Sequence, residues 1–181
     1  PADQSALTET VRFPMLLSPD RPLCVRPVTP ADTTLLAELI AGLSDTARRR
    51  RFFRPVPSSE LIWQEASRVT QREPRQGVAL VATASERGRV CAVALAELVH
   101  DPVAPTAAEL AVLVRDDMQR QGVGTRLLRL LIGLAGGRGV RTLHATLQAE
   151  NRPARQLLRK LGLAYHTEIR YGEITAWAEL P

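Results

Sequence analysis

Residues 109–125 read ELAVLVRDDMQRQGVGT, and this stretch decides the fold. Residues 109–114 form an apolar run headed by one carboxylate, which suits a strand buried on both faces better than an amphipathic helix. After the glycines, apolar side chains recur with a helical period that stops before Gly136, at Val123, Leu127, Leu130, Leu131 and Leu134. The sequence therefore predicts a buried strand, a basic glycine loop and a helix.

The loop between this strand and this helix has the composition of a phosphate site. The N–H groups in the first turn of a helix have no partner within the helix and lie at the positive end of its dipole, and glycines leave them open to a ligand. Arg120 and Arg126 add positive charge on either side, although solvated arginines at a helix start are an alternative interpretation. The loop lacks the Gly-Lys-Ser/Thr ending of a P-loop and the three-glycine dinucleotide fingerprint. We therefore expect a diphosphate in another kind of loop.

A second strand and helix follow within the same stretch. Residues 142–147 alternate apolar and polar side chains, which predicts a short strand. A helix opens after Asn151, a good N-cap, and ends near Gly162. Pro153 lies in its first turn, where a missing N–H has no cost.

These motifs resemble the GNAT N-acetyltransferases, which bind acyl-CoA. The spacing of Gln119, Gly122 and Gly124 matches the pattern Gln/Arg-x-x-Gly-x-Gly/Ala of the family's pyrophosphate loop. A second family pattern is matched at Asn151, Ala154, Leu157, Lys160 and Gly162. Leu158 stands where many members have tyrosine, and Leu163 replaces an aromatic residue, so the chain departs from the family at these two positions.

The order of elements along the chain agrees with this family. With 181 residues, 45% of them hydrophobic, the chain can form one domain. We expect residues 1–22 to be a partly ordered extension, with 11–17 an edge strand or a packing segment, and residues 23–181 to be the GNAT domain. The predicted fold is α/β (α+β), a mixed central sheet of about six or seven strands flanked by about four helices. Its further strands are expected at 23–26, 78–82, 90–98, 164–168 and 173–180, and its further helices after the caps Thr29 and Ser59.

Composition excludes several classes of function. The net charge is +5, and of the 24 basic residues only Lys160 is a lysine. Aromatic residues make up 4% of the chain and the arginines form a single cluster, so we expect no nucleic acid. No run approaches the roughly 20 apolar residues of a membrane helix, so we expect a cytoplasmic protein without a membrane partner. The cysteines and histidines lack metal-ligand spacing, and we expect no metal.

The arginine cluster lies at residues 44–53, which read SDTARRRRFF. The first interpretation is a short helix whose arginines lie in solvent and whose phenylalanines, Phe52 and Phe53, lie in the core. The functional alternatives are a docking surface for an acidic partner and contacts to a substrate loop.

Glu109 is the candidate catalytic residue. A free lysine amine has a pKa of about 10.4, so only roughly one in two thousand is neutral near pH 7 and a general base is useful. At the head of an apolar strand, partial burial would raise the pKa of Glu109 and suit it to accept a proton. The alternatives are a solvent-exposed residue at a strand end and an ion pair with a nearby arginine.

The chain is similar in particular to bacterial GNAT domains that acetylate lysines on acyl-CoA synthetases, through residues 108–124, the RRRRFF segment and AENRPARQLLRKLGL at 149–163. The resemblance implies an N-acetyltransferase with acetyl-CoA as co-substrate, Glu109 as base, and a protein lysine, on an acyl-CoA synthetase, as acceptor. It implies that backbone groups of Val112, Leu113 and Val114 contact the pantetheine and the thioester oxygen. It further implies that the pyrophosphate is held by Arg120, Gln121, Gly122, Val123, Gly124 and Thr125.

Asn151 would contact the cofactor near its reactive end. With Leu158 in place of tyrosine, water would protonate the leaving thiolate, or CoA would leave as the anion. Two alternative functions remain: a small-amine N-acetyltransferase, which would have an acidic, enclosed acceptor pocket, and a non-catalytic acyl-CoA sensor.

Overall fold

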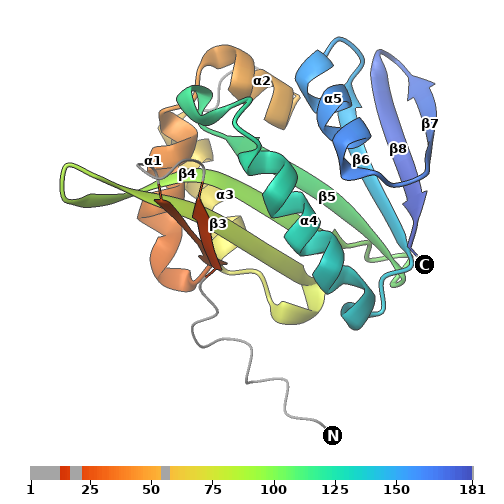
Figure 1. The fold of residues 1–181 in the computed structure, drawn as a ribbon, viewed down its shortest axis with the longest axis horizontal. Coiled ribbons are helices and arrows are strands. Elements are labelled where there is room, and N and C mark those ends of the chain that lie inside the picture. The colour runs from red at the N-terminus through yellow and green to blue at the C-terminus, as the bar shows by residue number, and fades with distance from the viewer. Residues whose placement is uncertain (1–12, 17–21, 54–57, 181) are drawn as a thin grey trace, which may run out of the picture.

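A computed structural model describes residues 13–16, 22–53 and 58–180, and these contain one eight-stranded sheet with the strand order β1-β2-β3-β4-β5-β6-β8-β7 (Figure 1). The strands are β1 (Phe13–Leu16), β2 (Pro22–Pro27), β3 (Gly77–Glu86), β4 (Arg89–His100), β5 (Ala107–Val114), β6 (Thr142–Gln148), β7 (Tyr165–Arg170) and β8 (Glu173–Glu179). The mixed sheet is confirmed, with one strand more than expected because residues 13–16 pair with β2 as an edge strand.

Five α-helices lie among the described residues: α1 (Thr33–Ala41), α2 (Asp45–Phe52), α3 (Ser59–Thr70), α4 (Val123–Ala135) and α5 (Arg152–Leu161). The cap of α3 is Ser58 and not Ser59 as predicted, because the Ser58 Oγ accepts the Leu61 N–H at 3.3 Å. After Thr29 a short 3-10 turn precedes α1, so that helix begins at Thr33. In the part of the chain that the structure describes, no helix is long and apolar enough to cross a membrane.

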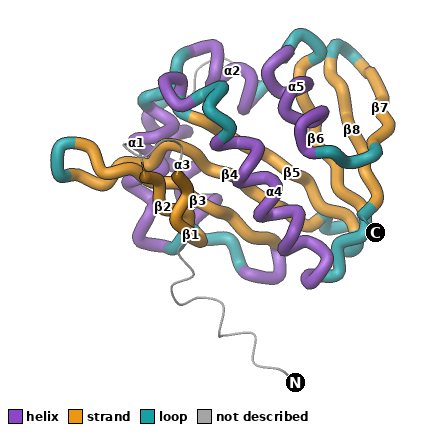
Figure 2. Tube along the Cα trace, in the orientation of Figure 1, coloured by secondary structure: helices purple, strands orange, loops and turns teal. Residues whose placement is uncertain are grey.

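Helices cover both faces of the sheet and divide the core in two. Figures 1 and 2 show α4 crossing one face, with α1 and α3 behind the other. Under α4, Leu127 and Leu131 pack with Leu110 of β5. Under α1 and α3, Leu36 and Val69 pack with Leu113 of the same strand. Because side chains alternate along a strand, β5 contributes to both cores, as its apolar sequence predicts.

The feature that creates the site is a separation of two parallel strands. β5 and β6 are register partners only from Ala107 with Thr142 to Glu109 with His144. On its other edge, β5 remains paired with β4 as far as Val114. Beyond Glu109 the strands diverge, and we call this point the fork. The edge of β5 that faces β6 has no strand partner beyond the fork within the described residues.

Candidate active site

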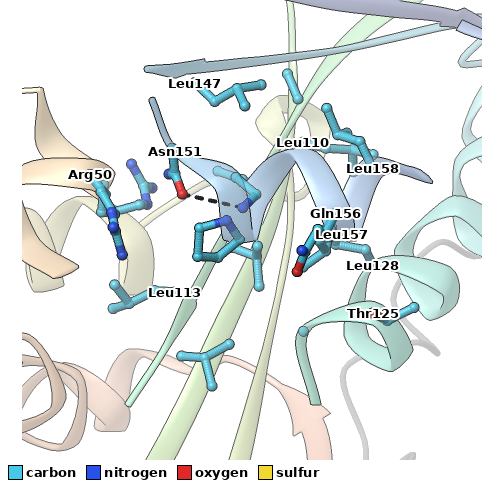
Figure 3. A pocket seen from close by; sticks show the side chains of 18 of the residues that line it. Arg50, Leu110, Leu113, Thr125, Leu128, Leu147, Asn151, Gln156, Leu157 and Leu158 are labelled. Carbon is cyan, nitrogen blue, oxygen red and sulfur yellow. Dashed lines mark hydrogen bonds between the residues drawn. The ribbon is translucent and has the colours of Figure 1, made fainter. Parts of the chain in front are cut away.

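A pocket of about 460 Å³ lies beyond the fork, between β5 and β6. Its floor comes from residues 109–114 of β5 and 145–147 of β6, and its walls come from α2, the beginning of α4 and the length of α5. Figure 3 shows Arg50 and Asn151 at one end of the pocket, with Thr125 of α4 at the other. The lining also includes Arg51, Phe53, Gln119, Arg120, Gly122, Gly124, Leu157, Leu158 and Lys160.

The glycine loop leads into α4 with open backbone donors. Gly122 is the N-cap at φ +84°, a left-handed conformation that favours glycine, and no side chain within the described residues caps the helix. Arg120 also has a positive φ, +61°. The Gln119 side chain donates to the Val114 carbonyl at 3.1 Å, which ties the loop to the end of β5. The first-turn N–H groups of α4 therefore face the pocket without a capping side chain.

The pocket lining includes the predicted loop residues with one exception. Gln121 lies outside the lining and its Nε2 donates to the Asp117 carbonyl at 2.7 Å. Arg126 is also outside the lining, whereas Arg120 is part of it. Of the two arginines that flank the glycines, the structure thus brings only Arg120 to the pocket.

Gly124 lies where two elements approach the start of α4 closely. A Cβ at this position would lie 3.1 Å from Leu157 Cδ1 of α5 and 3.3 Å from Val114 Cγ2 of β5. Such distances are tighter than ordinary carbon contacts of about 3.5–4.0 Å. The glycine lets α4 begin close to the pocket wall. The backbone of Gly124 is helical, so a glycine is favoured here by the limited space for a side chain and not by a positive φ.

Glu109 stands at the fork and lines the pocket. Its side chain is exposed, so the expectation of partial burial at the strand head is wrong. The physical reason is that β6 leaves β5 at this residue, so that the neighbouring strand does not continue beside it. Glu109 makes no ion pair within the described residues, which leaves its carboxylate available to a ligand.

The opposite wall is built by α5 and by its N-cap, Asn151. Asn151 is 7% exposed, and its Oδ1 accepts the Ala154 N–H at 3.2 Å, the predicted N-cap (Figure 3). Leu158 lines the pocket, and no tyrosine does so among the described residues. Tyr171 is fully exposed in the β7–β8 turn, and Tyr165 borders only a small separate hollow.

The arginine helix α2 differs from its first interpretation. Arg51 donates to Glu97 Oε1 at 2.6 Å, and Arg48 donates to Asp45 at 2.7 Å, so these two arginines are not solvated. Phe53 is 38% exposed in a left-handed C-cap at φ +57°, and Phe52 is half-buried, so Phe53 does not lie in the core as expected.

Glu97 organises a charge cluster that sequence reasoning missed. It is 1% exposed in β4 and accepts hydrogen bonds from Arg51, Arg68 and Arg72, at 2.6, 3.2 and 2.6 Å. Burial acts to raise the pKa of Glu97, but the charges of the three guanidinium groups outweigh it and hold that pKa at about 2. The signal in the sequence is a lone carboxylate within the apolar run VCAVALAELV at 90–99.

Comparisons with known proteins agree with this geometry. The sequence model of the acetyltransferase (GNAT) family matches residues 43–163. The GNAT domain of S. lividans PAT is similar in structure, with a TM-score of 0.80 and 24% identity over 93% of this chain and 97% of that one. A ribosomal-protein-S5-alanine acetyltransferase from Vibrio fischeri gives a TM-score of 0.69 and 12% identity over 94% and 96%.

A cAMP-binding acyltransferase from Mycobacterium smegmatis has a TM-score of 0.62 and 24% identity. The match covers 94% of this chain but 47% of that protein, so this chain spans about half of its length.

The forked sheet and its open helix start define an acyltransferase of the acyl-CoA-dependent class. The chain belongs to the GNAT acetyltransferase family. It is an N-acyltransferase whose co-substrate is acetyl-CoA.

Proposed function

We propose that this chain transfers the acetyl group of acetyl-CoA to the ε-amine of a lysine on a protein, and we favour an acyl-CoA synthetase as that protein. The observation that carries the proposal is the place of Glu109, an exposed carboxylate at the fork that also lines the pocket. A base at this point can meet an acceptor amine where the two strands open.

In this proposal Glu109 takes a proton from the lysine ammonium, directly or through water. The neutral amine then attacks the thioester carbon, the C–N bond forms, the C–S bond breaks, and the nitrogen releases its second proton to water to become the amide. CoA leaves as the thiolate or takes a proton from water, because Leu158 occupies the place of a tyrosine donor. Backbone groups of residues 112–114 would hold the thioester oxygen, and an aimed N–H of this kind lowers a barrier by about 3–4 kcal/mol.

The cofactor would enter along the glycine loop. Arg120 and the first-turn N–H groups of α4 would bind the pyrophosphate, and Asn151 would lie near the reactive end. The observations in support are the uncapped helix start at Gly122 and the position of Arg120 in the lining. Gln121, which the family resemblance assigned to the same group, would act through its backbone alone, because its side chain is bound to Asp117.

The charge of the pocket supports a protein acceptor over a small amine. Among the described residues its lining contains one carboxylate, Glu109, and the four cationic side chains Arg50, Arg51, Arg120 and Lys160, of which Arg51 is paired with Glu97 outside the lining. A site that selects a free cationic amine needs an excess of negative charge. A protein acceptor can instead be selected by contacts outside the pocket, so a basic pocket does not oppose it. The PAT name of the S. lividans relative supports the same class of acceptor.

The test compares an intact proteome with the same proteome after denaturation and digestion, each incubated with acetyl-CoA and the protein. Thiol release is followed, and acetyl-lysine is located by mass spectrometry. We expect acetylation at few lysines and only in the intact proteins. Thiol release without peptide modification would instead indicate a small-amine acceptor. Binding of CoA without thiol release would favour a sensor.

A further inference from the structure

The four arginines of α2 point in four directions, because successive residues of an α-helix are rotated by about 100°. Arg48 turns back along the chain and donates to the Ala41 carbonyl at 2.9 Å and to Asp45 at 2.7 Å. Arg51 reaches the sheet at Glu97. Arg49 is exposed to solvent and lies outside the pocket lining. Of these four arginines, Arg50 alone lines the pocket and has no ion-pair partner among the described residues.

Arg50 is half-buried and lines the pocket, and it makes no hydrogen bond or ion pair within residues 13–16, 22–53 and 58–180. Leu113 and Asn151 line the same pocket and are drawn on the same side of the view as Arg50 in Figure 3. A guanidinium that loses part of its hydration without gaining a partner raises the free energy of the protein. An anionic group on a ligand would remove that cost.

The backbone that carries Arg50 is held at two points. The Ser44 N–H and Oγ donate to the Asp116 carboxylate at 2.9 and 2.7 Å, which attaches the start of α2 to the segment before the glycine loop. One residue beyond Arg50, Arg51 is attached to the buried Glu97. The guanidinium of Arg50 is therefore presented to the pocket by an anchored helix. A rigid support of this kind is typical of a binding residue.

Arg50 lies away from the glycine loop, where the pyrophosphate is proposed to bind. In Figure 3 it is drawn on the same side of the pocket as Asn151, whereas Thr125 of the first turn of α4 is drawn on the opposite side. An anionic group bound at Arg50 would therefore be distinct from the pyrophosphate. It would lie in the half of the pocket where, in the proposed function, the acyl group and the acceptor meet. A guanidinium matches a carboxylate with two parallel hydrogen bonds.

We propose that Arg50 is a carboxylate-binding residue in the acyl and acceptor half of the pocket. This inference rests on the proposed function, which places acetyl-CoA along the glycine loop. The carboxylate has two sources: the free end of a dicarboxylic acyl chain, such as succinyl, or an acidic side chain next to the acceptor lysine. Arg50→Ala removes the site, and Arg49→Ala is the matched control, because it removes one charge from the same helix outside the pocket.

The first arm measures binding by calorimetry, with acetyl-CoA and succinyl-CoA as the probes. If the acyl chain is the source, the wild-type protein binds succinyl-CoA more tightly than acetyl-CoA. Arg50→Ala then reduces that preference about tenfold, and Arg49→Ala keeps it.

The second arm measures kcat/KM with acetyl-CoA for two peptides whose single lysine is followed by Glu or by Gln. If the acceptor is the source, the preference for the Glu peptide falls about tenfold in Arg50→Ala alone.

The proposal is overturned if the wild-type protein discriminates in neither arm, or if Arg49→Ala lowers both preferences as much as Arg50→Ala. Its failure can be separated from failure of the proposed function. The calorimetric arm reads binding alone, so the effect of Arg50 is measured even if no acetyl-lysine forms. Acetylation of lysine with no effect of Arg50 would retain the proposed function and reject the carboxylate site.

Discussion

Glu109 and His144 are the last register partners that β5 and β6 make before the two strands separate. Leu110, the next residue, packs under α4, so Glu109 projects from the opposite face of the sheet. His144 shares that face and stacks on Trp177 of β8, with ring centroids 4.7 Å apart. Glu109 is therefore reached from the side away from α4. In the proposed reaction, donor and acceptor approach the fork from opposite faces.

Replacing Glu109 by glutamine removes the proposed base and keeps the shape of the side chain. We expect Glu109→Gln to lower kcat by about 10²–10⁴, because proton transfer then falls to water. The Kd for acetyl-CoA should stay unchanged, since Glu109 lies apart from the glycine loop. Raising the pH from about 7 to about 10 should restore part of the activity as the lysine amine loses its proton. Steady-state kinetics and calorimetry measure the two quantities.

The control for this variant is Glu150→Gln, which changes an exposed carboxylate outside the pocket lining. An equal loss of turnover and of acetyl-CoA binding in Glu109→Gln would assign Glu109 a structural role.

Arg120→Ala tests the phosphate assignment. Because Arg120 would bind the pyrophosphate equally in the ground state and in the transition state, its loss should raise the KM for acetyl-CoA about tenfold and change kcat little. Arg126→Ala is the comparison, since Arg126 lies on the same loop and helix start but outside the lining. An unchanged KM in Arg120→Ala would contradict the assignment.

Local signals in the sequence account for most of what was predicted correctly. The apolar run of β5, the glycines before α4 and the Asn151 cap each specify structure within a few residues, and all three are confirmed. The exposure of Glu109 was predicted wrongly, because it depends on where β6 leaves β5, which is a matter of tertiary pairing. Local propensity does not contain that information.

The arginine run shows the same limit. A helix at this place follows from Ser44, whose Oγ accepts the Ala47 N–H at 3.2 Å as an N-cap. The partner of Arg51 is Glu97, which is 46 residues away, so no local pattern could have distinguished the bound arginine from the free one. A lone carboxylate in the apolar β4 run was the available hint that a buried cation lies nearby.

Glu97→Gln should destabilise the protein strongly. Three guanidinium groups would lose their shared carboxylate, and breaking a buried ion pair on one side typically costs about 3–5 kcal/mol in the free energy of unfolding. The control is Glu38→Gln, which breaks an exposed ion pair with Arg89 and should cost less than about 1 kcal/mol. Chemical denaturation measures both. Equal effects would show that the Glu97 cluster contributes no more than a surface pair.

The same residue predicts an acid transition. The pKa of Glu97 is about 2 in the folded protein, below its ordinary value of 4.5, so protons bind the unfolded chain more readily. Its contribution to stability is complete above pH 4.5 and is lost as the pH falls toward 2. We expect the free energy of unfolding to decrease in this window. Glu97→Gln should show a smaller decrease, and identical slopes in the two proteins would contradict the assignment.

Gly124→Ala tests whether the close packing at the start of α4 serves cofactor binding. Alanine suits the helical backbone and gains up to about 1 kcal/mol of helix propensity, so we expect the free energy of unfolding to change by less than about 1 kcal/mol. The new Cβ would lie 3.1 Å from Leu157 Cδ1 and would displace this side chain in the pocket wall. The Kd for acetyl-CoA should therefore rise about tenfold. Gly133→Ala on the same helix is the matched control, because its Cβ would point into open space and meet no other element of the described residues within 4 Å. If calorimetry gives the two variants the same Kd, the gap left by Gly124 is not used by the cofactor.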